Sequence, residues 1–100
     1  MEIQHSIQGA SDTTILIGRL DTLTAQQAQA HFQKLLHSQR YTHILDASKL
    51  TYISSSGLRV LLMIQKQLKP LGGQLFITHL HPELKEIFDI SGFSALFQFY

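Results

Sequence analysis

One stretch decides how this chain of 100 residues is interpreted: Asp46-Ala47-Ser48-Lys49-Leu50-Thr51-Tyr52-Ile53-Ser54-Ser55-Ser56-Gly57-Leu58-Arg59-Val60-Leu61-Leu62. It follows a short apolar segment and passes through a polar loop into three serines and a glycine. Serine is among the best N-terminal caps, because the first four backbone N–H groups of a helix have no carbonyl partner within the helix. The stretch therefore predicts a strand, a loop and a helix that begins near Ser55 and ends near Lys69.

The serines at this helix start are also a suitable place for a reversible negative charge. A helix N-terminus carries roughly half a unit of positive charge and offers free N–H groups to a phosphate. Phosphorylation adds about −1.5 to −2 charges at neutral pH, which is enough to repel or recruit a partner without refolding the domain. On these residues alone, a cap without phosphorylation is the favoured interpretation, because serine-rich helix starts are common.

The predicted helix has two different faces at about 100° per residue. The face expected to pack on a sheet consists of Leu58, Leu61, Leu62, Gln65 and Leu68. Val60 and Met63 fall on the other side, with Arg59 and Gln67. A protein partner would use this apolar pair if it is exposed. The alternative is that another element of the same domain covers it.

The chain before this stretch predicts a hairpin and a helix. Ile3, His5 and Ile7 alternate with polar residues as in a half-buried strand, and a four-residue connection, residues 9–12, leads to a second strand over residues 13–20. A helix from Ala25 to Ser38 follows the capping residues 21–24. Its expected apolar stripe consists of Leu23, Ala28, Phe32, Leu35 and Leu36.

The remaining segments alternate between strand and helix patterns. Residues 41–46 predict a central strand and residues 74–78 a further buried strand; a helix begins at Pro82 and is broken by Ser91 and Gly92. A last strand is expected within residues 96–100. This order favours an α/β fold with a mostly parallel sheet, in which the serine loop lies at the carboxyl end of a strand, where such sheets usually bind ligands.

Composition restricts the possible functions. Apolar residues make up 44% of the chain and charged residues 15%, which is typical of one globular domain over residues 1–100. The net charge is +1 and no stripe of Lys and Arg is present, so we expect no nucleic-acid partner. Residues 1–5 lack the basic region and the following apolar block of a signal peptide, and no segment approaches the ~20 apolar residues of a membrane span. We therefore expect a cytoplasmic protein that is monomeric when free.

Catalysis and cofactor binding are not indicated. The chain has no cysteine, and among its six histidines only His79 and His81 are close together, at strand-like spacing, so we expect no metal site. The two glycine motifs that bind nucleotides, Gly-x-x-x-x-Gly-Lys-Ser/Thr and Gly-x-Gly-x-x-Gly, do not occur in the sequence. Ser55 lacks the preceding glycine of a hydrolase nucleophile elbow.

The pattern Asp-x-Ser-x-Leu-x-x-Ile-x-Ser-Ser-Gly-Leu, residues 46–58, resembles the STAS domain of bacterial anti-sigma factor antagonists. The similarity continues in residues 72–75 and 87–93, so it covers most of the chain. It implies the STAS fold, a small mixed, mostly parallel sheet of four to five strands with an N-terminal hairpin and about four helices packed mainly on one face.

In that family, a serine after an Asp, in Asp-Ser-Ser-Gly or Asp-Ser-Thr-Gly, is phosphorylated by a kinase that is also the anti-sigma factor. Ser55 matches this phosphoacceptor, Ser56 the second hydroxyl and Gly57 the glycine. Ser54 departs from the pattern, since a neutral cap replaces the carboxylate.

The resemblance implies a partner-switching regulator that is not itself an enzyme. It would bind a serine kinase/anti-sigma factor of the histidine-kinase-like ATPase type and leave it when Ser55 is phosphorylated; a serine phosphatase of the PP2C type would reverse the change. The residues expected to contact partners are Asp21, Thr22, Ser54, Ser56, Gly57, Arg59, Val60 and Met63. The alternative is a non-switching STAS subunit of a larger assembly, such as a lipid-transport ABC system, in which Ser55 is only part of a cap.

Overall fold

The computed structural model describes residues 1–37, 40 and 42–100. The described strands are β1 (Glu2–Gln8), β2 (Ser11–Leu20), β3 (Thr42–Asp46), β4 (Leu50–Ile53), β5 (Gln74–Thr78) and β6 (Gln98–Phe99). The described helices are α1 (Ala25–Leu35), α2 (Ser55–Leu68) and α3 (Pro82–Ile90), with 3-10 turns η1 (Lys69–Leu71) and η2 (Ser94–Leu96).

The strands form one mixed sheet in the order β1-β2-β3-β5-β6, and β4 pairs with the far end of β2. Only β1 and β2 are antiparallel; the other described pairings are parallel. This confirms the predicted α/β class, the N-terminal hairpin and the central position of β3. The first residue of the predicted central strand, Tyr41, lies outside the described residues.

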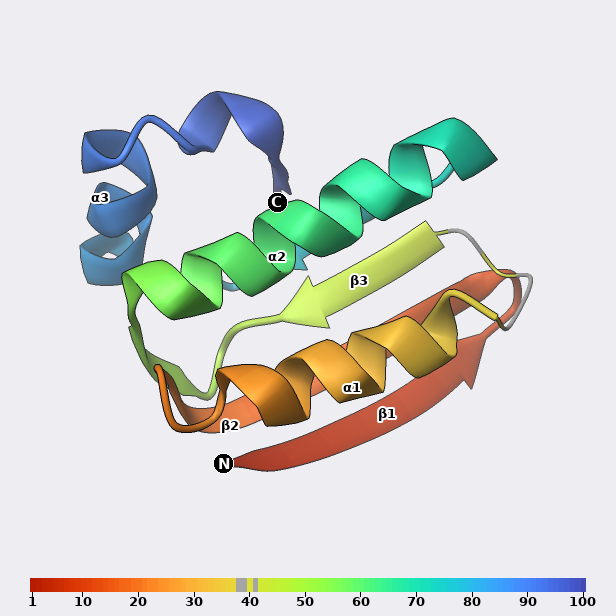
Figure 1. The fold of residues 1–100 in the computed structure, drawn as a ribbon, viewed down its shortest axis with the longest axis horizontal. Helices are drawn as coiled ribbons and strands as arrows, with labels where there is room; N and C mark the ends of the chain where they lie inside the picture. The colour runs from red at the N-terminus through yellow and green to blue at the C-terminus, as the bar shows by residue number, and fades with distance from the viewer. Residues whose placement is uncertain (38–39, 41) are drawn as a thin grey trace.

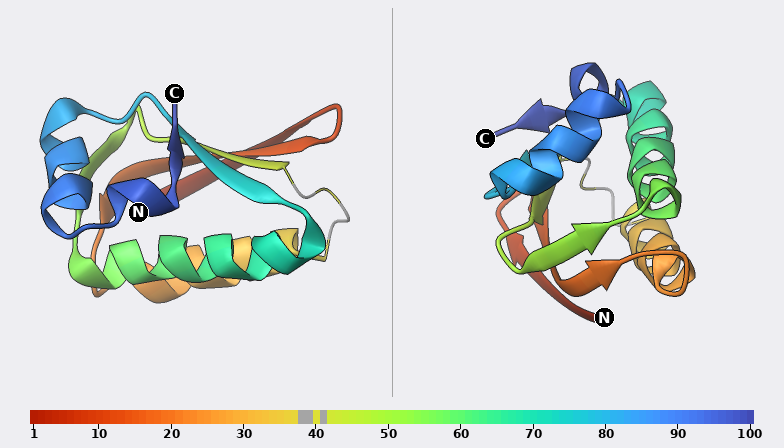
Figure 2. Two further views of the ribbon diagram at one scale, coloured as in Figure 1. Left: turned by 90° about the horizontal axis from the view of Figure 1, so that it is seen from above. Right: turned by 90° about the vertical axis from the view of Figure 1, so that its left-hand side faces the viewer.

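Two helices cover one face of the sheet. Figure 2 shows α1 and α2 side by side beneath the strands, while α3 lies at one end of the sheet, near β4. The core between these layers includes Leu16, Leu45, Leu75 and Ile77 from the strands and Phe32, Leu61 and Ile64 from the helices, all nearly inaccessible to solvent. None of the described helices is long and apolar enough to cross a membrane.

The hairpin is tighter than the sequence predicted. Its strands are joined by two residues, Gly9 and Ala10, because Gln8 already pairs with Ser11. Gly9 has φ 60°, the backbone conformation that glycine supplies without steric cost at the first position of a type II′ turn. The far end of the hairpin projects beyond α1 (Figure 2), which leaves Ile7 53% exposed and not half-buried as predicted.

The helix α1 is shorter than predicted and begins after the turn that contains Leu23. Leu23 is 91% exposed, so its assignment to the apolar stripe was wrong. Ala28, Phe32 and Leu35 are buried, as predicted. The predicted last residue of the helix, Ser38, lies outside the described residues.

Strand β4 was missed, since the sequence was interpreted as a polar loop there. Leu50 and Ile53 are buried, and the residues between them are exposed. The strand pairs in parallel with residues 18–20 of β2. It fixes the point at which α2 begins, because the chain passes from Ile53 directly into the N-terminal cap of α2.

Candidate functional site at the start of helix α2

Ser54 is the N-terminal cap of α2, as the serine pattern predicted. Its backbone is extended, with φ −95° and ψ 173°, and its hydroxyl oxygen accepts a hydrogen bond of 3.2 Å from the Gly57 amide. The Ser54 amide donates a 2.9 Å hydrogen bond to the carbonyl oxygen of Leu20, at the end of β2. The neutral side chain thus provides the hydrogen bond that a capping carboxylate would provide.

Ser55 is the first residue of α2 and is exposed. Among the described residues, no side chain or backbone group hydrogen-bonds to its hydroxyl. The first turn of α2 holds no acidic residue, so the positive end of the helix dipole has no local counter-charge. Ser55 therefore presents a free hydroxyl at a position that favours a negative group.

The turn between β2 and α1 lies beside the serines at the start of α2. Thr22 and Ser56 bring their hydroxyl oxygens to 3.3 Å. The Asp21 carboxylate braces the turn by accepting hydrogen bonds from the amides of Leu23, at 3.0 Å, and Thr24, at 3.2 Å. Partial desolvation opposes ionisation of Asp21, but the amide hydrogen bonds from Thr24 and Leu23 outweigh it, so the pKa of Asp21 is below its ordinary value.

Gly57 is buried against β2, and its expected contact with a partner stays a prediction. A Cβ atom at Gly57 would lie 2.7 Å from the carbonyl oxygen of Leu20 and 2.8 Å from Leu20 Cγ. Only glycine lets the first turn of α2 approach β2 this closely. The residue therefore sets the position of the serines by packing.

Val60 is also buried, with 5% of its surface exposed. The sequence left open whether Val60 is exposed or covered by another element of the domain, and the structure shows that it is covered. The helix α1 packs alongside α2 (Figure 1), and Gln33 of α1 donates a 2.9 Å hydrogen bond to Gln67 of α2. The wheel of a single helix cannot show which side a neighbouring helix will cover.

The other predicted contact residues remain accessible to different degrees. Arg59 is exposed and Met63 is half-buried. Asp21, Ser54 and Ser56 are half-buried, and Thr22 is exposed. With Ser55 they lie on the β2–α1 turn and the first turns of α2, two segments that the Thr22–Ser56 contact joins.

Two exposed residues next to the Asp21 turn were missed. The guanidinium carbon of Arg19 lies 4.2 Å from the centroid of the Tyr52 ring, and Arg19 Nε is 3.5 Å from Asp21 Oδ2. The pairing of β2 with β4 places Arg19 directly opposite Tyr52. Only the prediction of β4 could have revealed this cation–π pair.

The site has a restricted chemistry. The part of the chain that the structure describes holds no group of three or more metal-ligating side chains. No histidine or carboxylate among the described residues hydrogen-bonds to Ser55 as a general base would. The arrangement suits a hydroxyl that receives a group from a partner and a surface that a partner recognises.

The fold and this site define a small α/β domain with an exposed serine at the start of a helix. The STAS domain family matches residues 9–100 of the chain. The chain therefore belongs to the STAS family, and it is an anti-sigma factor antagonist-like STAS domain.

Its relatives agree with this assignment. The protein named "Putative anti-sigma factor antagonist BtrV" from Bordetella bronchiseptica is 38% identical over 82 residues, which cover 82% of this chain and 71% of that protein. The structure of an anti-sigma factor antagonist from Mycobacterium paratuberculosis superposes with a TM-score of 0.89 at 16% identity, covering 99% of this chain and 84% of that one. The phosphorylated form of the Bacillus cell fate determinant SpoIIAA gives a TM-score of 0.76 at 20% identity, with coverages of 99% and 91%.

Proposed function

We propose that this protein is a partner-switching regulator whose switch is the phosphorylation of Ser55. The observation that carries the proposal is the exposed Ser55 hydroxyl, which has no hydrogen bond to the described residues and lies at a helix start without an acidic residue. The relative named as an anti-sigma factor antagonist and the fold shared with phosphorylated SpoIIAA support it.

The unphosphorylated surface is the one that docks on the partner. It is formed by Thr22 and Asp21 from the β2–α1 turn and by Ser54, Ser56, Arg59 and Met63 from α2. The partner is a serine kinase of the histidine-kinase-like ATPase type that also acts as the anti-sigma factor. The kinase supplies the ATP that phosphorylates Ser55, so this domain is a substrate. Binding to the kinase and release from it take place in the cytoplasm.

Phosphorylation changes the charge of the surface without changing the fold. The phosphate would lie at the positive end of α2, and Arg59 follows Ser55 by four residues, the spacing of side chains that meet on a helix. These groups hold the new charge of about −1.5 to −2 in place. The partner then has to desolvate this charge or face it with its own acidic groups, so the complex dissociates, and a phosphatase of the PP2C type restores it.

Binding to the kinase tests the proposal. Ser55→Ala keeps the neutral surface and should retain the kinase in co-purification and in titration calorimetry, whereas Ser55→Asp should weaken binding. The same substitutions at Ser6, which is exposed on β1 outside this surface, are the control and should change affinity less. Equal affinity of the Ala and Asp variants of Ser55 would overturn the switch. A stoichiometric assembly that forms equally well with both variants would indicate a permanent subunit.

A further inference from the structure

The helix α2 carries a one-sided charge that extends beyond the switch surface. Its cations Arg59 and Lys66, and Lys69 just after its end, are accompanied by no acidic residue anywhere between Asp46 and Glu83. All three are exposed. Among the described residues, no ion pair involves any of them. The outer side of the helix is thus a positive surface without internal neutralisation.

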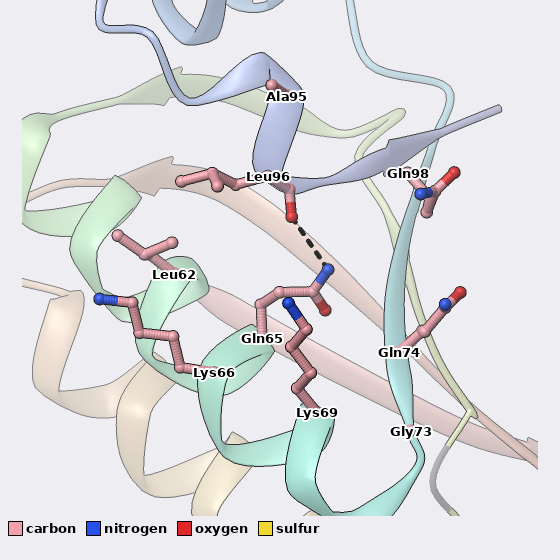
Figure 3. Close-up of a pocket in the computed structure, with 9 residues that line it drawn as sticks. All are labelled: Leu62, Gln65, Lys66, Lys69, Gly73, Gln74, Ala95, Leu96 and Gln98. Carbon is pink, nitrogen blue, oxygen red and sulfur yellow. Dashed lines mark hydrogen bonds between the residues drawn. The ribbon is translucent and has the colours of Figure 1, made fainter.

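Two hollows lie along this surface. One, of about 340 Å³, runs between α2 and the segment around η2 and is lined by Leu62, Lys66, Lys69 and Leu96 among others (Figure 3). The second, of about 300 Å³, is lined by Arg59, Leu62, Met63, Lys66 and Gln67. Leu62 and Lys66 line both hollows and form the ridge between them. Each hollow therefore combines an apolar wall with cations at its rim.

Hydrogen bonds of the Gln65 side chain fix the shape of the first hollow. Its side-chain nitrogen donates a 3.0 Å hydrogen bond to the carbonyl oxygen of Leu96, and its side-chain oxygen accepts a 2.9 Å hydrogen bond from the Leu75 amide. Figure 3 shows the first of these bonds crossing the groove between α2 and η2. The two walls are thereby held at a fixed separation, which leaves Leu96 46% exposed at the rim.

We propose that this surface binds an acidic amphipathic helix of a partner protein. The cations recur along α2 at positions 59, 66 and 69, a span of about 15 Å at 1.5 Å per residue, so they match carboxylates spaced along a parallel or antiparallel helix. Two apolar side chains one turn apart on that helix fit the two hollows. Three separated cations flanked by leucines and a methionine suit such a helix better than a continuous phosphate backbone.

The proposed helix site shares Arg59 and Met63 with the switch surface and extends beyond it to Lys66 and Lys69. Lys66 follows Ser55 by eleven residues, or about 16 Å along the helix. A partner could therefore stay bound here while the contacts around Ser55 change. A negative charge at Ser55 lies four residues from Arg59 and should weaken binding at that end only, so Ser55→Asp should reduce the affinity for an acidic peptide less than Lys66→Glu does.

The test uses a stapled helical peptide of about four turns, with two leucines one turn apart flanked by glutamates. Titrated into the isotope-labelled protein, it should shift amide signals of residues 59–69 and 94–98. Lys66→Glu should weaken binding about tenfold and Lys66→Gln by less, because the first reverses the charge and the second only removes it. Lys49→Glu, a reversal on an exposed turn outside the groove, should change affinity less than twofold.

Three results would overturn the proposal. They are equal binding of a peptide whose glutamates are replaced by glutamines, shifts that lie outside the groove, and no binding of the acidic peptide at low salt. Stronger response of the same residues to phosphatidylserine vesicles would assign the surface to a membrane instead. Shifts that depend only on the protein's own concentration would assign it to a second copy, whose α3 carries Glu83 and Glu86.

Discussion

The hydroxyl oxygens of Thr22 and Ser56 lie 3.3 Å apart although 34 positions separate the residues in the sequence. The contact joins the β2–α1 turn to the first turn of α2. It exists because β4 pairs with the end of β2 and delivers the chain to the cap at Ser54, whose amide bonds to Leu20. The switch surface is therefore assembled from two segments, and its geometry depends on the close packing beneath it.

Replacing Gly57 should test that packing. Gly57→Ala would bring a Cβ to within 2.8 Å of Leu20 Cγ, so we expect a loss of about 1–3 kcal/mol in the free energy of unfolding, measured in urea. Ser56→Ala, the adjacent position, removes one surface contact and should cost less than about 0.5 kcal/mol. A Gly57→Ala variant as stable as the wild type would show that α2 can begin further from β2.

The cap at Ser54 should tolerate a carboxylate and not a methyl group. Ser54→Ala removes the acceptor for the Gly57 amide and should cost about 0.5–2 kcal/mol in thermal or urea unfolding. Ser54→Asp keeps an acceptor and adds a charge that the helix dipole favours by about 0.3–1 kcal/mol. The account of the cap would be wrong if the two variants were equally destabilised.

A buried polar cluster should make stability depend on pH. His31 and His43 lie near Asp12, which is inaccessible to solvent and accepts hydrogen bonds from His5 and Arg40. Burial lowers the pKa of His43 despite its hydrogen bond to the Arg40 carbonyl. Burial, and then the charge of His5, lower the pKa of His31.

The direction of this pH dependence follows from the difference in bound protons between the folded and unfolded chains. Below the ordinary histidine pKa of about 6.5 the unfolded chain binds protons that the folded protein does not, so stability is lost as the pH falls from there through the lowered folded values. His31→Gln keeps a polar partner for the Thr14 hydroxyl, 2.8 Å away in the native protein, and should flatten the curve of unfolding free energy between about pH 6.5 and 5. His37→Gln, at an exposed position, should leave the slope unchanged; an unchanged slope in the His31 variant would contradict the assignment.

Substitutions of Leu23 and Phe32 should differ sharply in their effect on stability, although the sequence placed both residues on one apolar stripe. Leu23→Asp alters a side chain that is 91% exposed and should change the free energy of unfolding by less than about 0.5 kcal/mol. Phe32→Ala should cost about 3–5 kcal/mol, because Phe32 is 1% exposed. Chemical denaturation of both variants checks this, and a costly Leu23 substitution would place the turn against the core.

The predictable parts of this fold rest on local signals. The serine cap at Ser54, the helix that follows it and the helix that begins at Pro82 are encoded by residues within a few positions of one another. The resemblance to a known family added the mixed sheet with helices mainly on one face and the identity of Ser55 as the candidate switch.

The parts that were missed depend on contacts between distant segments. Strand β4 is only four residues long, and its buried residues Leu50 and Ile53 do not alternate as in a longer strand. Val60 is buried on a helix that packs against α1, and Gly57 is buried against Leu20. Neither neighbour can be identified from the periodicity of α2 itself.

The most direct test of the switch is the intact mass and phosphosite map of this protein isolated from its own cells, with Ser55→Ala and Ser56→Ala expressed in its place as controls. We predict a population heavier by one phosphoryl group, mapped to Ser55, absent from the Ser55 variant and present in the Ser56 variant. A protein that stays unmodified under several growth conditions and is recovered in a stable assembly would contradict the switch.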